Sequence, residues 1–188
     1  MSSRLAPLPA PYPPAVAQTL ERLMGGRELE PLALFRTIAH HPELLERFRQ
    51  IGSTLLSFGR LDAADRETII QRTTARCCAA YEWGVHAAIF GPAVGLGEAW
   101  LRATWEGEAD DPAFTPRQAL LVRACDELHD RAALSDAAWA ELSAAYDDAE
   151  LVEIVCLAGF YHLVSFACGA FRPAPETWAA EPPVTAGG

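Results

Sequence analysis

Good helix formers dominate this chain between two proline-rich ends, and the strict apolar–polar alternation of a half-buried strand is absent. Prolines inside this region fall at segment boundaries, at Pro31, Pro42, Pro92, Pro112 and Pro116. The pattern of apolar and polar positions therefore predicts an all-α fold.

The segments between these boundaries predict the individual helices. Asp62 and Ser135 can cap two helix N-termini, and Thr115 precedes a proline at the first position of a third helix. The predicted helices cover residues 15–25, 31–40, 42–57, 63–77, 79–90, 93–106, 116–132, 135–146 and 148–171.

The proline-rich ends also predict the domain organisation. Residues 1–14 read as a polyproline-like N-terminal arm, residues 15–172 as a single all-α domain, and residues 173–188 as a flexible C-terminal tail. Residues 66–72 (RETIIQR) and 117–123 (RQALLVR) echo each other, which suggests two related helical hairpins, but seven positions are too few to establish a duplication.

Residues 151–171 form an apolar run that is long enough to span a membrane. The run contains Glu153 and His162, lacks basic flanks that would orient a span, and is the only such stretch. We therefore interpret it as a central helix buried on all sides, to which a subunit partner could contribute, and we expect no membrane partner.

Charge and cysteine content narrow the class of protein. Of 188 residues, 51% are apolar, which is typical of a globular chain, and the net charge of −10 argues against nucleic acid as a partner. The five cysteines show no disulfide-framework spacing, and prolines interrupt any signal-like run near the N-terminus. These features predict reduced thiols in a cytoplasmic protein.

Residues 77–86 (CCAAYEWGVH) carry the densest group of reactive side chains. On a helix, Glu82 and His86 lie one turn apart, so the carboxylate could orient the imidazole and raise its pKa. Tyr81 could donate to an oxyanion, and Trp83 on the other flank packs or lines a substrate pocket. Such a Glu–His pair is commonly idle on a helix surface, but its apolar neighbours indicate burial, where a charge must be paired or used.

Two other chemistries stay open for this motif. A redox site needs a reactive thiolate, and adjacent helical cysteines point about 100° apart, which leaves Cys78 as a single-thiol candidate. A metal site on Cys78, Glu82 and His86 fails because ligands about 6 Å apart along one helix cannot converge. Two of them could bind with help from His129 or His162, although His162 is more typical of a hydrogen-bonded core histidine. We predict no metal.

Residues 65–100 resemble the core of the carboxymuconolactone decarboxylase / AhpD-like alkylhydroperoxidase superfamily. The similarity rests on residues 66–70 (RETII), on the Tyr-Glu-Trp triplet followed by His86, and on the glycine before the next helix. Residues 116–171 resemble the second half of many members. The resemblance implies an AhpD-like helical bundle that assembles as a homo-oligomer, whether dimer, trimer or hexamer.

The peroxidase branch of this superfamily has a glutamate, then Cys-x-x-Cys, then a histidine four positions after the second cysteine. Counting back from His86 places the glutamate on Glu67 and the two cysteines on Ala79 and Glu82, and Cys78 is one residue out of register. The chain is more similar to the decarboxylase branch, in which carboxylates and a histidine move protons without a cofactor.

Glu67 can share a site with His86 only if the chain turns back between them. In one unbroken helix the two residues would lie roughly 28 Å apart. The resemblance implies a break near residues 77–80, and the weak helix formers Thr73 and Thr74 are compatible with one.

Three hypotheses follow. The first is a cofactor-independent acid–base enzyme, a decarboxylase-like lyase acting on a small carboxylated or lactone-like molecule. In it His86 is the general base or acid, Glu82 orients His86, Glu67 is a second proton carrier, and Tyr81 binds an oxyanion or the substrate. The second is an AhpD-like alkylhydroperoxidase, an antioxidant peroxidase that uses Cys78. The third is a non-catalytic helical oligomer of the same fold.

Overall fold

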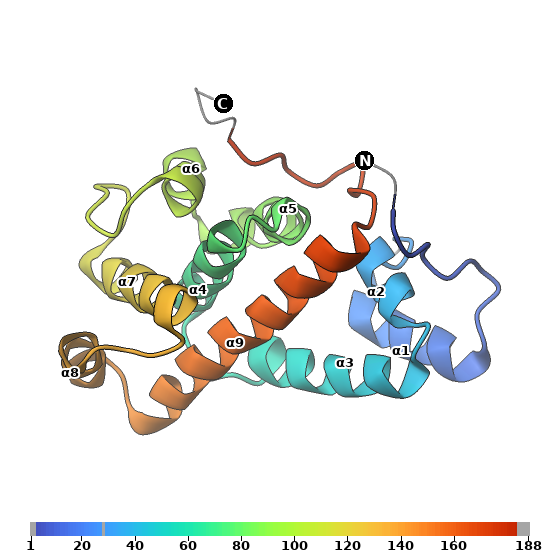
Figure 1. Ribbon diagram of the computed structural model, residues 1–188, viewed down its shortest axis with the longest axis horizontal. Coiled ribbons are helices and arrows are strands. Elements are labelled where there is room, and N and C mark those ends of the chain that lie inside the picture. The colour runs from blue at the N-terminus through green and yellow to red at the C-terminus, as the bar shows by residue number, and fades with distance from the viewer. Residues whose placement is uncertain (1–2, 28, 184–188) are drawn as a thin grey trace. The chain divides into compact units, whose positions relative to one another are not determined.

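The computed structural model describes residues 3–27 and 29–183, which form helices and connecting loops with no strand among them (Figure 1). This confirms the predicted all-α class. The elements are α1 (Pro14–Met24), α2 (Ala33–Ile38), α3 (Pro42–Ser57), α4 (Ala63–Arg76), α5 (Ala80–Ile89), the 3-10 helix η1 (Pro92–Val94), α6 (Glu98–Glu106), α7 (Pro116–Arg131), α8 (Asp136–Ala145) and α9 (Asp148–Phe171).

The three predicted N-caps are confirmed. The side chains of Asp62 and Ser135 each accept a hydrogen bond from a backbone amide in the first turn of α4 and α8. Thr115 and Gln118 form a reciprocal capping box at the start of α7. These bonds satisfy amides that a helix N-terminus otherwise leaves without a partner, which is why the helices begin where the sequence indicates.

The predicted helix over residues 93–106 is wrong in its first part. The chain forms η1 there, passes through Gly95 with φ +71°, and begins α6 only at Glu98. Glycine adopts this left-handed conformation without a steric penalty, and it ends the short helix.

The chain divides into two compact units, and the single all-α domain over residues 15–172 stays a prediction. The first unit draws on residues 1–59 and 167–177, and the second on residues 60–166 and 178–188. Residues 148–166 of α9 belong to the second unit, and residues 167–171 at its end belong to the first.

The first unit packs α1 and α2 against α3. Its N-terminal arm is held by backbone hydrogen bonds, from the Arg4 amide to the Phe171 carbonyl (2.9 Å) and from the Leu8 amide to the Arg36 carbonyl (3.1 Å). Residues 1–2 of the predicted arm lie outside the described residues. The core side chains of this unit include Val16, Leu20, Leu34, Leu45 and Phe48.

The second unit is organised around α4, which packs against α5, α6 and α7 (Figure 1). Three ion pairs join α4 to α7, and the residue numbers rise together on both helices, so the two helices run parallel. The pairs are Asp65–Arg117 (2.6 Å), Arg72–Asp126 (2.7 Å) and Arg76–Asp130 (2.6 Å). The two similar segments, residues 66–72 and 117–123, lie on α4 and α7. The repeat of a helical hairpin stays a prediction.

The C-terminal segment is attached to the helices, where the sequence predicted a flexible tail. Glu176 accepts a hydrogen bond from the Ala33 amide in the first unit (2.7 Å). The Ala180 amide donates to the Gly84 carbonyl in the second unit (3.1 Å). Residues 184–188 of the predicted tail lie outside the described residues.

Helix α9 is long and apolar enough to cross a membrane by length and composition, with a mean hydropathy of 1.9. More than half of that apolar window, 56%, is buried in the structure, as in the core helix of a globular protein. Burial on all sides, which we expected, is not found, because Val152, Leu163 and Phe166 are 64%, 52% and 67% exposed. The predicted homo-oligomer stays a prediction.

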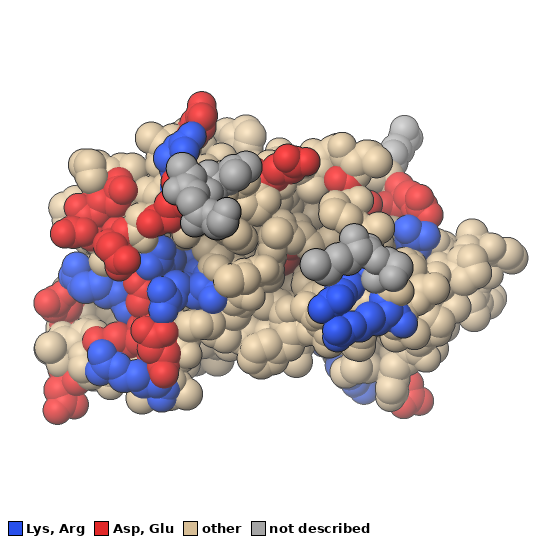
Figure 2. Space-filling model, turned by 45° about the horizontal axis from the view of Figure 1, so that its top comes forward, with Lys and Arg blue, Asp and Glu red and all other residues tan. Residues whose placement is uncertain are grey.

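Charged side chains of both signs are interspersed on the face shown in Figure 2. Several arginines form surface ion pairs, among them Arg60–Asp147 and Arg123–Glu141. Exposed pairs of this kind contribute little to stability, whereas loss of one partner from the largely buried Arg72–Asp126 pair between α4 and α7 would leave an unpaired buried charge.

Candidate active site

The expected break between α4 and α5 is confirmed. Helix α4 ends at Arg76, α5 begins at Ala80, and Cys78 between them adopts φ +53°. The Ala79 amide donates to the Thr74 carbonyl (2.8 Å), which closes the turn. Because α5 then packs against α4, a residue early in α4 can meet a residue late in α5.

Glu67 and His86 are those two residues. The Nδ1–H of His86 donates to Glu67 Oε2 at 2.8 Å, and the residues are only 3% and 1% exposed. A carboxylate that accepts from Nδ1 leaves the lone pair of a neutral imidazole on Nε2. The bond therefore selects the tautomer and presents Nε2 for proton transfer.

The Nε2 atom of His86 faces Tyr161, a residue of α9 that is absent from the site predicted from the sequence. The Tyr161 hydroxyl lies 2.9 Å from Nε2, and its ring meets the imidazole edge-on. Phe90 stacks on the imidazole at a centroid distance of 4.7 Å. The one available signal was a tyrosine inside an apolar run, since a buried phenol requires a hydrogen-bond partner.

We had expected Glu82 to orient His86. It lies beside this group but does not have that role. Its Oε1 atom is 3.6 Å from His86 Nε2, which is too long for a hydrogen bond and leaves an electrostatic contact. The orienting carboxylate is Glu67, and Glu82 is a second buried acid at 5% exposure.

Glu82, His86 and Tyr161 each have a raised pKa in the folded protein. Burial raises the pKa of Glu82, and the neighbouring Glu67 charge adds to the increase while His86 opposes it. Burial alone would lower the pKa of His86, but Glu67 and Glu82 together raise it above its ordinary value. Burial also raises the pKa of Tyr161 well above its ordinary value, with contributions from both carboxylates.

Three buried polar atoms around the site make no hydrogen bond to any described residue, namely Arg66 Nε, Glu67 Oε1 and Glu82 Oε2. Arg66 Nε lies 3.8 Å from Glu67 Oε1. Buried polar atoms in native proteins are almost always satisfied, so these atoms are available to a small polar molecule.

Two of the predicted site residues have other surroundings. Trp83 is 2% exposed, donates to Thr104 Oγ1 (3.2 Å) and meets the Trp105 ring edge-on, so we assign it to packing rather than to a substrate pocket. Tyr81 is buried, and the phenol that reaches His86 is Tyr161.

The cysteines do not join the Glu67–His86 group. Among the described residues, the hydrogen-bond partners of the His86 ring are Glu67 and Tyr161, and neither is a thiol. Cys78, the redox candidate, is exposed in the turn before α5. Burial raises the pKa of Cys125 to about 12, which suppresses its thiolate.

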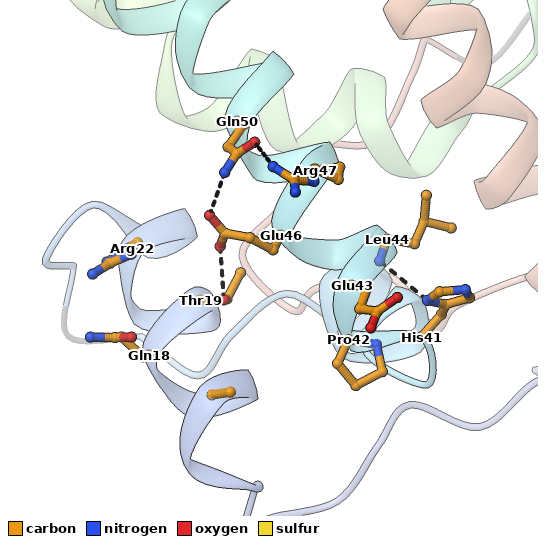
Figure 3. Close-up of a pocket in the computed structure, with 11 residues that line it drawn as sticks. Gln18, Thr19, Arg22, His41, Pro42, Glu43, Leu44, Glu46, Arg47 and Gln50 are labelled. Atoms are coloured by element: carbon orange, nitrogen blue, oxygen red, sulfur yellow. Dashed lines mark hydrogen bonds between the residues drawn. The ribbon is translucent and has the colours of Figure 1, made fainter.

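A surface pocket of about 780 Å³ belongs to the first unit and lies between α1 and α3 (Figure 3). Glu46, one of its charged residues, already accepts hydrogen bonds from Thr19, Arg49 and Gln50. The hydrogen bond from Arg49 lowers the pKa of Glu46 to about 2. We assign no catalytic role to this pocket, because the Glu46 carboxylate is held by these neighbours and the buried Glu67–His86 pair is not among the lining residues.

No protein-family model and no curated protein sequence matches the chain. Solved structures do match. An uncharacterised peroxidase-related protein with an alkylhydroperoxidase AhpD core, from Ralstonia eutropha JMP134, has a TM-score of 0.77 and 17% identity over 94% of this chain and 95% of its own. An uncharacterised peroxidase-related protein from Silicibacter sp. TM1040 has a TM-score of 0.78 and 17% identity over 91% and 90%.

A third similar structure is that of the debrominase Bmp8, with a TM-score of 0.70 and 14% identity over 94% of both chains. At these identities the matches establish the fold, and they bear out the AhpD-like helical bundle that the sequence resemblance implied. They do not distinguish among the activities open to that fold.

Proposed function

We propose that this chain, which has the AhpD-like helical fold, is a cofactor-independent acid–base enzyme of decarboxylase type. The supporting observation is the buried hydrogen-bonded series Glu67–His86–Tyr161, with Glu82 as a further acid at its end. A positioned imidazole with a carboxylate behind it and a second protonated acid in front of it is suited to proton transfer near neutral pH.

The substrate class that fits is a small molecule carrying a carboxylate next to a carbonyl or lactone. Arg66 Nε is buried without a hydrogen-bond partner among the described residues, and an arginine can bind a carboxylate. The unpartnered oxygen of Glu82 can donate to the substrate when that acid is protonated, as its raised pKa favours.

A decarboxylation at this site balances without a redox partner. The bond between the carboxyl carbon and its neighbour breaks, carbon dioxide leaves, and the electron pair moves into the adjacent carbonyl as an enolate. Tyr161 donates a hydrogen bond to the enolate oxygen, and a proton from imidazolium or Glu82 then reaches the carbon. Glu67 stabilises the imidazolium while it holds that proton.

A panel of carboxylated lactones and 3-oxo acids tests this proposal, with carbon dioxide release and deuterium incorporation from D2O followed by NMR. We expect turnover by the wild type, loss of turnover in His86→Ala with the helical circular dichroism spectrum retained, and unchanged turnover in Cys78→Ser. Turnover that survives His86→Ala would overturn the assignment.

The same proteins distinguish a thiol peroxidase. Hydroperoxide consumption that requires Cys78 and not His86 would favour that chemistry, whereas we expect none. Hydroperoxide is included as a substrate because two proteins of similar fold are described as peroxidase-related.

A further inference from the structure

Three side chains outside the Glu67–His86 group converge in the second unit. They are Cys77 at the end of α4, His129 in the last turn of α7 and His162 in α9. One ligand atom of each, Cys77 Sγ and a ring nitrogen of each histidine, lies within 4.8 Å of the others, and all three residues are half-buried. From the sequence we predicted no metal, and the cysteine considered as a ligand was Cys78 rather than Cys77.

We propose that Cys77, His129 and His162 bind a divalent transition-metal ion of the Zn²⁺ class. This site is separate from the proposed acid–base site and does not depend on it. Thiolate and imidazole are the ligands that Zn²⁺ prefers, and three protein ligands leave the fourth tetrahedral position for water.

The distances fit one ion. Two nitrogens bound tetrahedrally to Zn²⁺ lie about 3.3 Å apart, and a bound sulfur and nitrogen about 3.6 Å apart. In the structure His129 Nδ1 lies 3.1 Å from His162 Nε2 and 3.7 Å from Cys77 Sγ. The three atoms therefore need only small shifts to share an ion.

The hydrogen bonding of His162 prepares it as a ligand. Its Nδ1–H donates to the Ala158 carbonyl at 2.8 Å, which leaves the Nε2 lone pair directed toward His129. Metal-binding histidines almost always donate their other ring N–H to a carbonyl or carboxylate in this way. Burial lowers the pKa of His129, and His162 and Arg76 add to that decrease, so the neutral imidazole that a metal requires is favoured.

The surrounding charges tolerate a cation. Arg76 is the nearby positive group, and it is already paired with Asp130 at 2.6 Å and lies 3.5 Å from Asp126. Burial raises the pKa of the Cys77 thiol, while a hydrogen bond with Ser165 and the charge of Arg76 oppose that rise. Metal binding replaces the thiol proton, so the overall reaction is Zn²⁺ plus thiol giving the zinc thiolate and one released H⁺.

Titration of the reduced full-length protein with Co²⁺ tests the site, because tetrahedral cobalt with a thiolate ligand gives strong visible bands and a sulfur-to-cobalt charge-transfer band. We expect both features in the wild type and their displacement by Zn²⁺. Calorimetry with Zn²⁺ in two buffers of different ionisation enthalpy should report one proton released near pH 7.

Matched variants locate the ligands. Cys77→Ser, His129→Ala and His162→Ala should each weaken Zn²⁺ binding by more than about 100-fold, since even outer hydrogen-bond partners of a metal ligand are worth about 10–100-fold. Cys77→Ser should also abolish the charge-transfer band. The control Cys78→Ser removes the exposed neighbouring thiol and should change neither affinity nor spectrum.

Three results would overturn the proposal: an octahedral cobalt spectrum without the charge-transfer band, an equal loss in Cys78→Ser, or unchanged affinity in both histidine variants. If Cys77→Ser does not fold, alkylation of the wild type decides instead. Zn²⁺ should then protect Cys77 from iodoacetamide and leave the exposed Cys78 and Cys156 reactive, and equal labelling of all three would reject the site.

Discussion

Glu67 Oε2 and His86 Nδ1 are 2.8 Å apart, although 19 positions separate the two residues along the chain. The turn at residues 77–79 makes this possible, because it reverses the chain between α4 and α5. The pair is enclosed by protein, where a charge–charge contact is stronger than in water. The properties of the His86 imidazole therefore depend on a residue from a different helix.

Glu67→Gln should lower the pKa of the His86 imidazole, because it removes the negative charge that favours imidazolium while keeping a similar shape. NMR titration of the His86 ring measures this without a substrate. On a substrate found by the panel, kcat should fall by about 100-fold or more. Glu98→Gln, on an exposed side chain, is the control, and an unchanged His86 pKa in Glu67→Gln would contradict the assigned pairing.

Tyr161→Phe should leave His86 Nε2 without its hydrogen-bond donor. We expect a loss of about 1–2 kcal/mol in the free energy of unfolding and a change in the titration of the His86 ring. Tyr146→Phe is a matched control, because Tyr146 donates a buried hydrogen bond to Asp65 instead. It should cost similar stability and leave the His86 titration as it was. If both variants change that titration equally, Tyr161 has no specific role.

The local sequence pattern was sufficient to predict the position of most helices, because caps and helical periodicity are encoded within a few neighbouring residues. Asp62 and Thr115 begin their helices as predicted. The segment after Pro92 differs because Gly95 takes a left-handed conformation that helix propensity alone does not reveal. The attachment of the tail through Ala180 is tertiary, and composition could not have indicated it.

The candidate site was predictable in part. Spacing brought Glu82 and His86 together, and the family resemblance added Glu67. The division of roles between Glu67 and Glu82 could not be predicted. One-turn spacing places Glu82 and His86 on the same face of a helix but does not set the distance between their side chains. Tyr161 was missed for a related reason, since nothing in the sequence indicates which face of α9 meets His86.

His86 and Glu82 should each make stability fall as the pH rises, because both have raised pKa values in the folded protein, whereas the lowered pKa of His129 acts in the opposite direction up to about 6.5. The His86 contribution is complete below its ordinary value of 6.5 and is lost as the pH rises through the raised pKa. Glu82 acts in the same direction above its ordinary value of 4.5, because the unfolded chain loses that proton first. Each such proton contributes a slope of about 1.4 kcal/mol per pH unit.

Urea unfolding from about pH 5 to about pH 9 measures this dependence. Glu82→Gln should make the decline shallower, because the variant has no proton to retain at that position. Glu141→Gln changes an exposed carboxylate and should keep the wild-type slope. An identical pH dependence in the wild type and Glu82→Gln would contradict the raised pKa of Glu82.

Asp126→Ala should destabilise the protein by about 3 kcal/mol. Arg72 is 2% exposed and donates to both Asp126 oxygens, at 2.7 and 2.8 Å, so removing the carboxylate leaves a buried cation without its main partner. Glu141→Ala is the comparison, because it removes the carboxylate from the exposed pair with Arg123 and should cost less than about 1 kcal/mol. Equal losses in a denaturant titration would show that burial of the pair is unimportant.

Gly84→Ala should displace the C-terminal segment from α5. A Cβ at this position would clash with the Ala180 carbonyl oxygen, and the Ala180 amide would lose its 3.1 Å hydrogen bond to Gly84. We expect a loss of about 1–3 kcal/mol and faster proteolysis within residues 178–183. Gly159→Ala meets no atom within 4 Å and gains helix propensity, so it should be neutral or stabilising. A truncated chain that ends before Trp178 completes a double-mutant cycle with Gly84→Ala. In the truncated chain the substitution should lower the free energy of unfolding by much less than in the full-length chain. An equal loss in both would show that the clash is not with the C-terminal segment.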